Sequence, residues 1–130
     1  MKRRPGAGPL ETAYWPEEIR LKSSDRVLVV RYDDGVVQTL PLELLRVESP
    51  SAEVQGHTPS QKRIVPGKRA VGVKSIDPVG RYAIRIHFDD GHQTGLYTWK
   101  YLRDLGDRQA EVWQTYLDAL ATRGLSRDAG

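Results

Sequence analysis

The sequence predicts a small α+β domain, built from two similar strand-turn-strand-helix units that share one sheet and one core, followed by a helix. Three observations predict this fold. The motif YDDG at 32–35 returns as FDDG at 88–91, both motifs lie between short apolar and β-branched segments, and residues 107–124 carry apolar side chains at helical spacing. The glycines of the two motifs are 91 − 35 = 56 residues apart, and a segment ending in Leu-Arg follows each motif. We therefore interpret the pattern as an internal repeat.

The first unit of the repeat is predicted over residues 27–46, in a fold that begins near Trp15. Residues 1–14 are rich in glycine, proline and basic side chains, and we expect them to form a disordered basic tail. Alternating or β-branched residues predict strands at 19–21, 27–32 and 36–40. Asp34-Gly35 supplies a hairpin turn, because glycine accepts the positive φ that such a turn requires. Pro41 and the leucines after it, which are spaced to face one side, predict a short helix at 41–46.

The second unit follows a long polar loop at 47–69, in which we expect one helical turn after Ser49. Strands are predicted at 70–76 and 82–88, with a turn at 77–80 and a return strand at 92–96. Thr98 is placed to cap a helix and Gly106 to end it. The core domain is thus predicted at 15–106, with an amphipathic helix and tail at 107–130. The apolar face of that helix contains Trp113, Tyr116, Leu117, Leu120 and Ala121, and Gly124 follows it.

Length and composition exclude several functions. With 130 residues and no cysteine, the chain has room for one modest core and cannot by itself hold a disulfide, a thiolate nucleophile or a cysteine-ligated zinc ion or iron–sulfur cluster. No segment has the apolar length of a membrane span or signal peptide, so we expect a cytoplasmic protein without membrane association. A net charge of +3 is too small to favour nucleic acid as the partner.

The paired aspartates decide whether the sequence contains a reactive site. Neighbouring residues diverge in a turn, so Asp89 and Asp90 are not placed to share a proton as a catalytic dyad does. A repeated fold needs its turn twice, which favours a turn role for both motifs. The alternative is a divalent-ion site formed by Asp89, Asp90 and His92, with His57 from the long loop. No Ser-His-Asp arrangement is marked, because Ser49 and Ser51 lie in a proline-containing loop and not in a nucleophile elbow.

Longer motifs identify the chain as a member of a known family. From about 16 to 105 it contains PEEIRL, YDDG, LELLRVESPSAEVQGH, PGKR and IDPVGRYAIRIHFDDGHQTGLYTWKYL. Together these resemble the gamma-butyrobetaine hydroxylase-like N-terminal domain family, long described as a domain of unknown function. The resemblance implies a small α+β domain that stands alone in bacteria, precedes the catalytic domain of carnitine-biosynthesis hydroxylases, or is attached to iron–sulfur carrier ATPases.

The resemblance also implies a metal position. In the hydroxylases three cysteines and a histidine hold a structural zinc ion, and the matching positions here are Ser49, Ser51, Val54 and His92. Serine hydroxyls are poor zinc ligands and valine is none, so no zinc cofactor is expected. The iron-binding catalytic domain of the hydroxylases has no counterpart in these residues. We therefore expect no oxygenase activity.

Two functions from different classes follow. The first is a non-catalytic, stand-alone interaction module for a protein partner linked to iron–sulfur assembly or to a 2-oxoglutarate oxygenase, with Tyr97, Trp99 and Tyr101 as its aromatic contact surface. The second is an iron or other metal-binding protein that uses His92, Asp89, Asp90 and His57. The sequence predicts neither the identity of the partner nor the oligomeric state.

Overall fold

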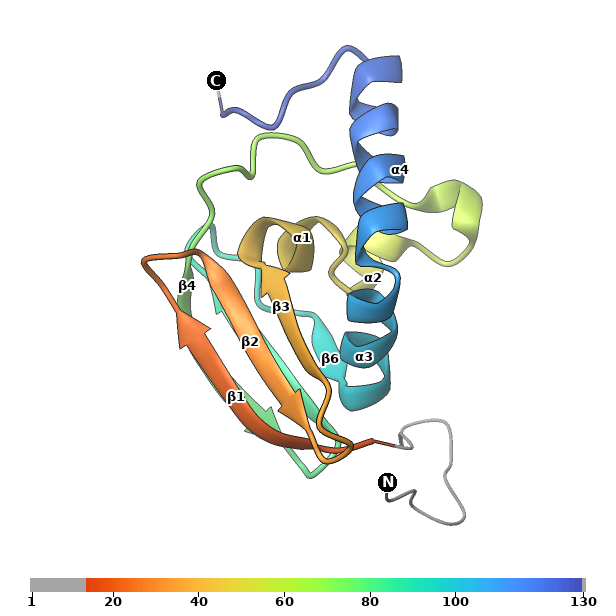
Figure 1. The fold of residues 1–130 in the computed structure, drawn as a ribbon. Helices are drawn as coiled ribbons and strands as arrows, with labels where there is room; N and C mark the ends of the chain where they lie inside the picture. Colours follow the sequence, from red (N-terminus) through yellow and green to blue (C-terminus); the bar gives the residue numbers. More distant parts are fainter. Residues whose placement is uncertain (1–13, 130) are drawn as a thin grey trace.

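The computed structural model describes residues 14–129 and confirms the α+β class (Figure 1). The predicted disordered tail at 1–13 lies outside the described residues, whereas Tyr14 packs against the core. The elements in chain order are β1 (Pro16–Lys22), β2 (Val27–Tyr32), β3 (Val37–Pro41), α1 (Leu42–Val47), α2 (Ala52–Gln55), the 3₁₀ helix η1 (Pro59–Gln61), β4 (Val73–Val79), β5 (Ala83–Phe88), β6 (Leu96–Thr98), α3 (Trp99–Asp107) and α4 (Gln109–Thr122).

The strands form two antiparallel sheets, and the expectation of a single shared sheet is wrong. One sheet has the order β1-β2-β3 and the other β4-β5-β6. Their apolar faces meet in one core, to which β2 contributes Leu28 and Val30 and β5 contributes Ile86 and Phe88. Alternation along a strand determines which side chains are buried. It does not determine whether an edge of the first sheet pairs with an edge of the second.

The repeat itself is confirmed in three dimensions. In each unit a DDG turn joins the central strand to the third strand, which leads directly into a helix: β3 into α1, and β6 into α3. Leucines of both helices are buried in the common core, among them Leu44 and Leu45 from α1 and Leu102 and Leu105 from α3. The two helices therefore occupy equivalent places in the two units.

Two strand boundaries in the second unit differ from the prediction. β4 begins at Val73 and continues through Asp77–Val79, the segment predicted as a turn. Proline has no N–H to donate. Pro78 is tolerated in β4 because β4 is an edge strand, in which some backbone N–H groups point away from the sheet and make no bond within it. β6 comprises only Leu96–Thr98, so residues 92–95 form an irregular connection instead of the predicted strand.

The C-terminal part folds onto the domain. Thr98 caps α3 as predicted, its Oγ1 accepting a hydrogen bond from the Tyr101 amide at 3.0 Å, but α3 continues past Gly106 to Asp107. α4 buries Tyr116 and Leu120 against Val47. The chain then returns beside the 60s loop (Figure 1), where the Arg69 amide donates to the Arg127 carbonyl at 3.0 Å. These contacts fix the loop that borders the candidate site.

Candidate functional site

Both DDG motifs form the same turn, which confirms the structural interpretation of the paired aspartates. Asp34 Oδ1 accepts the Val36 amide at 3.2 Å, and Asp90 Oδ1 accepts the His92 amide at 3.1 Å. Gly35 and Gly91 have φ angles of 86° and 91°. Glycine adopts this region freely and most other residues do not.

The second aspartate of each motif also has a partner that sequence reasoning missed. Asp34 receives two bonds from Arg103 in α3, at 3.2 and 3.0 Å. Asp90 receives one from Arg46 in α1, at 2.8 Å. Each turn is therefore tied to the helix of the other unit. The signal was present in the sequence, because an arginine ends the Leu-Arg pair of both repeats.

The two turns differ at the residue that follows each glycine. This residue is Val36 in the first unit and His92 in the second, although both backbone amides make the same bond to an aspartate. Val36 packs against the apolar core. The repeated turn therefore does not require a histidine, and the surroundings of His92 are specific to the second unit.

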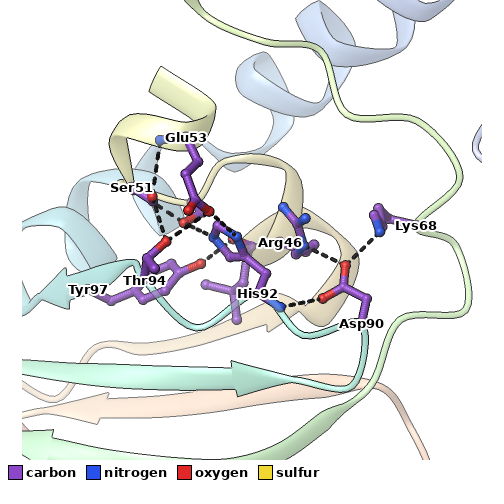
Figure 2. A network of polar contacts seen from close by, with 10 residues as sticks. Arg46, Ser51, Glu53, Lys68, Asp90, His92, Thr94 and Tyr97 are labelled. Atoms are coloured by element: carbon purple, nitrogen blue, oxygen red, sulfur yellow. Dashed lines mark hydrogen bonds and ion pairs between the residues drawn. The ribbon is translucent and has the colours of Figure 1, made fainter. Parts of the chain in front are cut away.

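His92 is the centre of a polar corner, in which Figure 2 shows Ser51, Glu53 and Thr94 beside it. Ser49 belongs to the same corner through its contact with His92. His92 Nε2 lies 2.8 Å from Ser49 Oγ, and Nδ1 lies 3.2 Å from Glu53 Oε1. Ser51 Oγ caps α2 through the Glu53 amide at 3.2 Å and lies 2.7 Å from Thr94 Oγ1. The residues come from the end of α1, from α2 and from the connection before β6, so only the tertiary fold brings them together.

The electrostatics of the corner favour a neutral histidine. Burial lowers the pKa of His92, and the nearby Arg46 lowers it further, while Glu53 and Asp90 act in the opposite direction. A neutral imidazole has one donor and one acceptor nitrogen. Nδ1–H then donates to Glu53, and Nε2 accepts the hydroxyl proton of Ser49.

This order of groups is that of a Ser-His-acid triad, which the sequence analysis did not find. The acid is Glu53, in place of the aspartate of a Ser-His-Asp arrangement. It precedes His92 by 92 − 53 = 39 residues, so no local motif marks it. The serine, however, is fully buried. A Cβ atom placed on Gly95 would lie 2.4 Å from Ser49 Oγ, which shows how closely the backbone covers the hydroxyl. A substrate carbonyl cannot reach this oxygen without displacement of the chain.

The donor set does not fit a zinc ion. At the four positions that the family resemblance implies, the side chains supply two hydroxyls, a buried valine and an imidazole whose two nitrogens both have partners. Within residues 14–129, no group of three or more His, Asp or Glu side chains is placed to hold one ion. Asp90 is held by Arg46 and Lys68, and Asp89 and His57 are exposed. The four predicted iron ligands therefore do not gather in this structure.

The predicted aromatic contact surface requires correction. Tyr97 is fully buried and donates to the Leu45 carbonyl at 2.5 Å, while Trp99 is buried and donates to the Arg81 carbonyl at 2.7 Å. Tyr101 is half-buried and donates to the Glu48 carbonyl. The three rings pack into the fold because β6 and the start of α3 cover the core. They do not form an exposed surface.

Fold and site define a class of protein: a small two-unit α+β domain with a polar corner that is closed by side-chain hydrogen bonds. Residues 19–103 match the family described as gamma-butyrobetaine hydroxylase-like, N-terminal. The chain belongs to this family, because the match covers well over half of its residues.

Solved structures agree with this assignment. Two proteins with NMR solution structures are 45% and 43% identical to the chain, with TM-scores of 0.76 and 0.79; the alignments cover 88% and 94% of this chain and 90% and 91% of theirs. A crystal structure from Acidithiobacillus ferrooxidans, of a protein of unknown function in the DUF971 family, is 45% identical over 70% of this chain and 91% of its own, with a TM-score of 0.60. No curated protein matches the sequence. No helix within residues 14–129 is long and apolar enough to cross a membrane.

We expect His92→Ala to weaken the fold by about 1 to 2 kcal/mol without abolishing it, because two side-chain hydrogen bonds are lost and the buried Ser49 hydroxyl loses the acceptor of its proton, although it still accepts from the Ser51 amide. Urea denaturation measures the difference. His57→Ala is the control: its side chain is exposed, and it should change stability by less than about 0.5 kcal/mol.

The same pair of variants tests the metal hypothesis. Ferrous iron, zinc and manganese should leave the melting temperature of the wild type unchanged under anaerobic conditions. A metal-dependent rise that disappears in His92→Ala would contradict the closed corner and favour the iron-binding alternative.

Proposed function

We propose that the protein is a non-catalytic interaction module, which binds a protein partner of iron–sulfur assembly or of 2-oxoglutarate oxygenase chemistry. The observation that carries this proposal is the closed polar corner. Ser49, the hydroxyl that contacts His92, is fully buried, and both nitrogens of His92 are used within the corner. A group whose hydrogen bonds are satisfied within the protein stabilises the fold and has no unused donor or acceptor for a substrate.

The family supports an accessory role. Its description refers to the N-terminal part of gamma-butyrobetaine hydroxylase-like proteins, so the domain is known from its position beside another domain. A related chain of 45% identity is described as a protein of unknown function. We infer that this domain contacts a protein partner in the way that the family's N-terminal domain accompanies the domain beside it. Cytoplasmic location belongs to the same proposal.

The absence of hydrolase chemistry is tested with a fluorophosphonate probe, which labels activated serines. The wild type and Ser49→Ala should both remain unlabelled at neutral pH, as judged by intact-protein mass spectrometry. Ser60, an exposed serine outside the corner, provides the internal measure of background reaction. Labelling of Ser49 that is lost in His92→Ala would overturn the non-catalytic assignment.

The partner is tested by capture and reconstitution. The tagged full chain is retrieved from its native cells after mild crosslinking, and the enriched proteins are identified by mass spectrometry. We expect an iron–sulfur or oxygenase-related protein, which is then purified and titrated with the untagged chain. Failure of every enriched protein to bind in this second step, or enrichment of enzymes from unrelated chemistry only, would contradict the proposal.

A further inference from the structure

A hollow of about 520 Å³ opens beside the polar corner, between α2 and the segment 63–66. Its lining includes Arg46 and His92 from the two repeat units, Glu53 and Val54 from α2, and Arg63 from the loop. We propose that this hollow binds a small oxyanion, a carboxylate or phosphate group, through the guanidinium groups of Arg46 and Arg63. This ligand site goes beyond the interaction role and does not depend on it.

The first argument is an unsatisfied donor. Arg46 uses Nε for its bond to Asp90 at 2.8 Å, while its Nη1 is buried without a hydrogen-bond acceptor among the described residues. Leaving a buried donor of a charged group without a partner is costly. Nη1 has almost no accessible surface, so an anion in the hollow, which Arg46 lines, can accept only from the other terminal nitrogen, Nη2, for which no acceptor is present among the described residues.

The second argument is a comparison with the equivalent arginine of the other unit. Arg103 makes two bonds to Asp34, and its guanidinium lies 4.4 Å from the ring centre of Tyr14 and 4.9 Å from that of Tyr32. Aromatic rings thus occupy the space beside Arg103. At Arg46 a single bond to Asp90 is made and the space beside it is the hollow. Both side chains are 12% exposed, and Arg103 Nε, like Arg46 Nη1, is buried without a hydrogen-bond partner among the described residues. The two equivalent arginines therefore differ in what borders them, aromatic rings at Arg103 and the hollow at Arg46.

The third argument is the local charge. Asp90 Oδ2 is shared between Arg46 and Lys68, at 2.8 and 2.6 Å, so one carboxylate faces two cations. Arg63 is exposed, and its side chain has no partner among the described residues. Arg46 and Arg63 line the hollow together with one carboxylate, Glu53, while Lys68 and Asp90 form an ion pair outside the lining. The surplus of positive charge favours an anion, and planar guanidinium groups match the oxygens of carboxylate and phosphate.

Glu53 limits what the hollow accepts. Glu53 lines the hollow, and its carboxylate bonds with His92 and accepts from Thr94 at 3.1 Å. A negative charge close to it is repelled. The site therefore fits a ligand that places its anionic group at the arginines and away from α2.

The test is an NMR titration of ¹⁵N-labelled full-length protein with sodium succinate and, separately, with inorganic phosphate, at ionic strength kept constant with sodium chloride. We expect saturable shifts of the Val54, Arg63 and His92 amides. Arg63→Gln should weaken binding about threefold or more, as the loss of one exposed ion pair predicts. Arg63 contributes only its backbone amide to the fold, through the Val54 carbonyl at 2.7 Å, so this variant should fold normally.

Arg85→Gln is the matched control, because Arg85 is an exposed arginine outside the hollow and the variant has the same change in charge. It should bind as the wild type does, and Glu53→Gln should bind more tightly. Saturation by succinate alone, by phosphate alone or by both supports the site and identifies the preferred oxyanion. Shifts that do not saturate, or equal weakening by Arg63→Gln and Arg85→Gln, would overturn it.

Discussion

Asp90→Asn should destabilise the domain by about 2 kcal/mol, whereas Asp89→Asn should cost less than about 0.5 kcal/mol. The two residues are neighbours in the same turn, but only Asp90 neutralises cations. When residue 90 carries no charge, Arg46 and Lys68 have no anion beside them. Water does not fully replace it, because their side chains are only 12% and 22% exposed. The expected cost lies between that of a surface pair and that of a fully buried pair, because the side chain of Asp90 is 19% exposed.

The effect of Asp90→Asn should depend on pH. Burial alone would raise the pKa of Asp90, but hydrogen bonds from Lys68, the His92 amide and Arg46 outweigh it and hold the pKa well below its usual range. A carboxyl group with a depressed pKa in the folded state stabilises the protein above its unfolded-state pKa of about 4 and loses this contribution as the pH falls further. The difference between wild type and Asp90→Asn should therefore be constant at neutral pH and shrink below about pH 4.

Urea denaturation of the wild type and both variants, at pH 7, 5 and 3, measures these effects. Equal losses of stability in Asp89→Asn and Asp90→Asn would show that the aspartates stabilise the turn itself and not the contact with the other unit. A difference that grows toward pH 3 would contradict the ion-pair explanation.

Gly35→Val and Gly91→Val should each destabilise the domain by about 1 to 3 kcal/mol. Both glycines have φ near +90°, and a β-branched residue is strained there. Space is not the cause, because a Cβ atom at either position would have no neighbour within 4 Å. The cost is therefore one of backbone conformation only.

An asparagine substitution tests whether the backbone conformation is the cause, since asparagine tolerates positive φ better than valine does. Gly91→Asn should lose clearly less stability than Gly91→Val in thermal denaturation, and the same order should hold at Gly35. Thermal midpoints of the valine variants close to that of the wild type would contradict the proposed role of the turns.

Local signals predicted most elements of the fold. Thr98 was identified as a cap and Gly35 and Gly91 as turn residues, because each role depends on the chemistry of one residue and its immediate neighbours. The same reasoning failed at Pro78, which it placed in a turn. The proline is accommodated by its position at a sheet edge, and that position is a property of the assembled sheet.

The sequence by itself determined the family, the α+β class, the repeat and the turn role of the paired aspartates, since all of these are encoded in residue types at short or regular spacing. Tertiary structure decided the rest. Ser49 and His92 are 43 residues apart in the chain and 2.8 Å apart in space, and Asp90 and Arg46 are separated by 44 residues. Pairs of this kind depend on how the two units pack against each other. Packing also decided that Tyr97 is in the core, because a strand residue is exposed or buried according to what covers its face, and the residue type alone does not specify that.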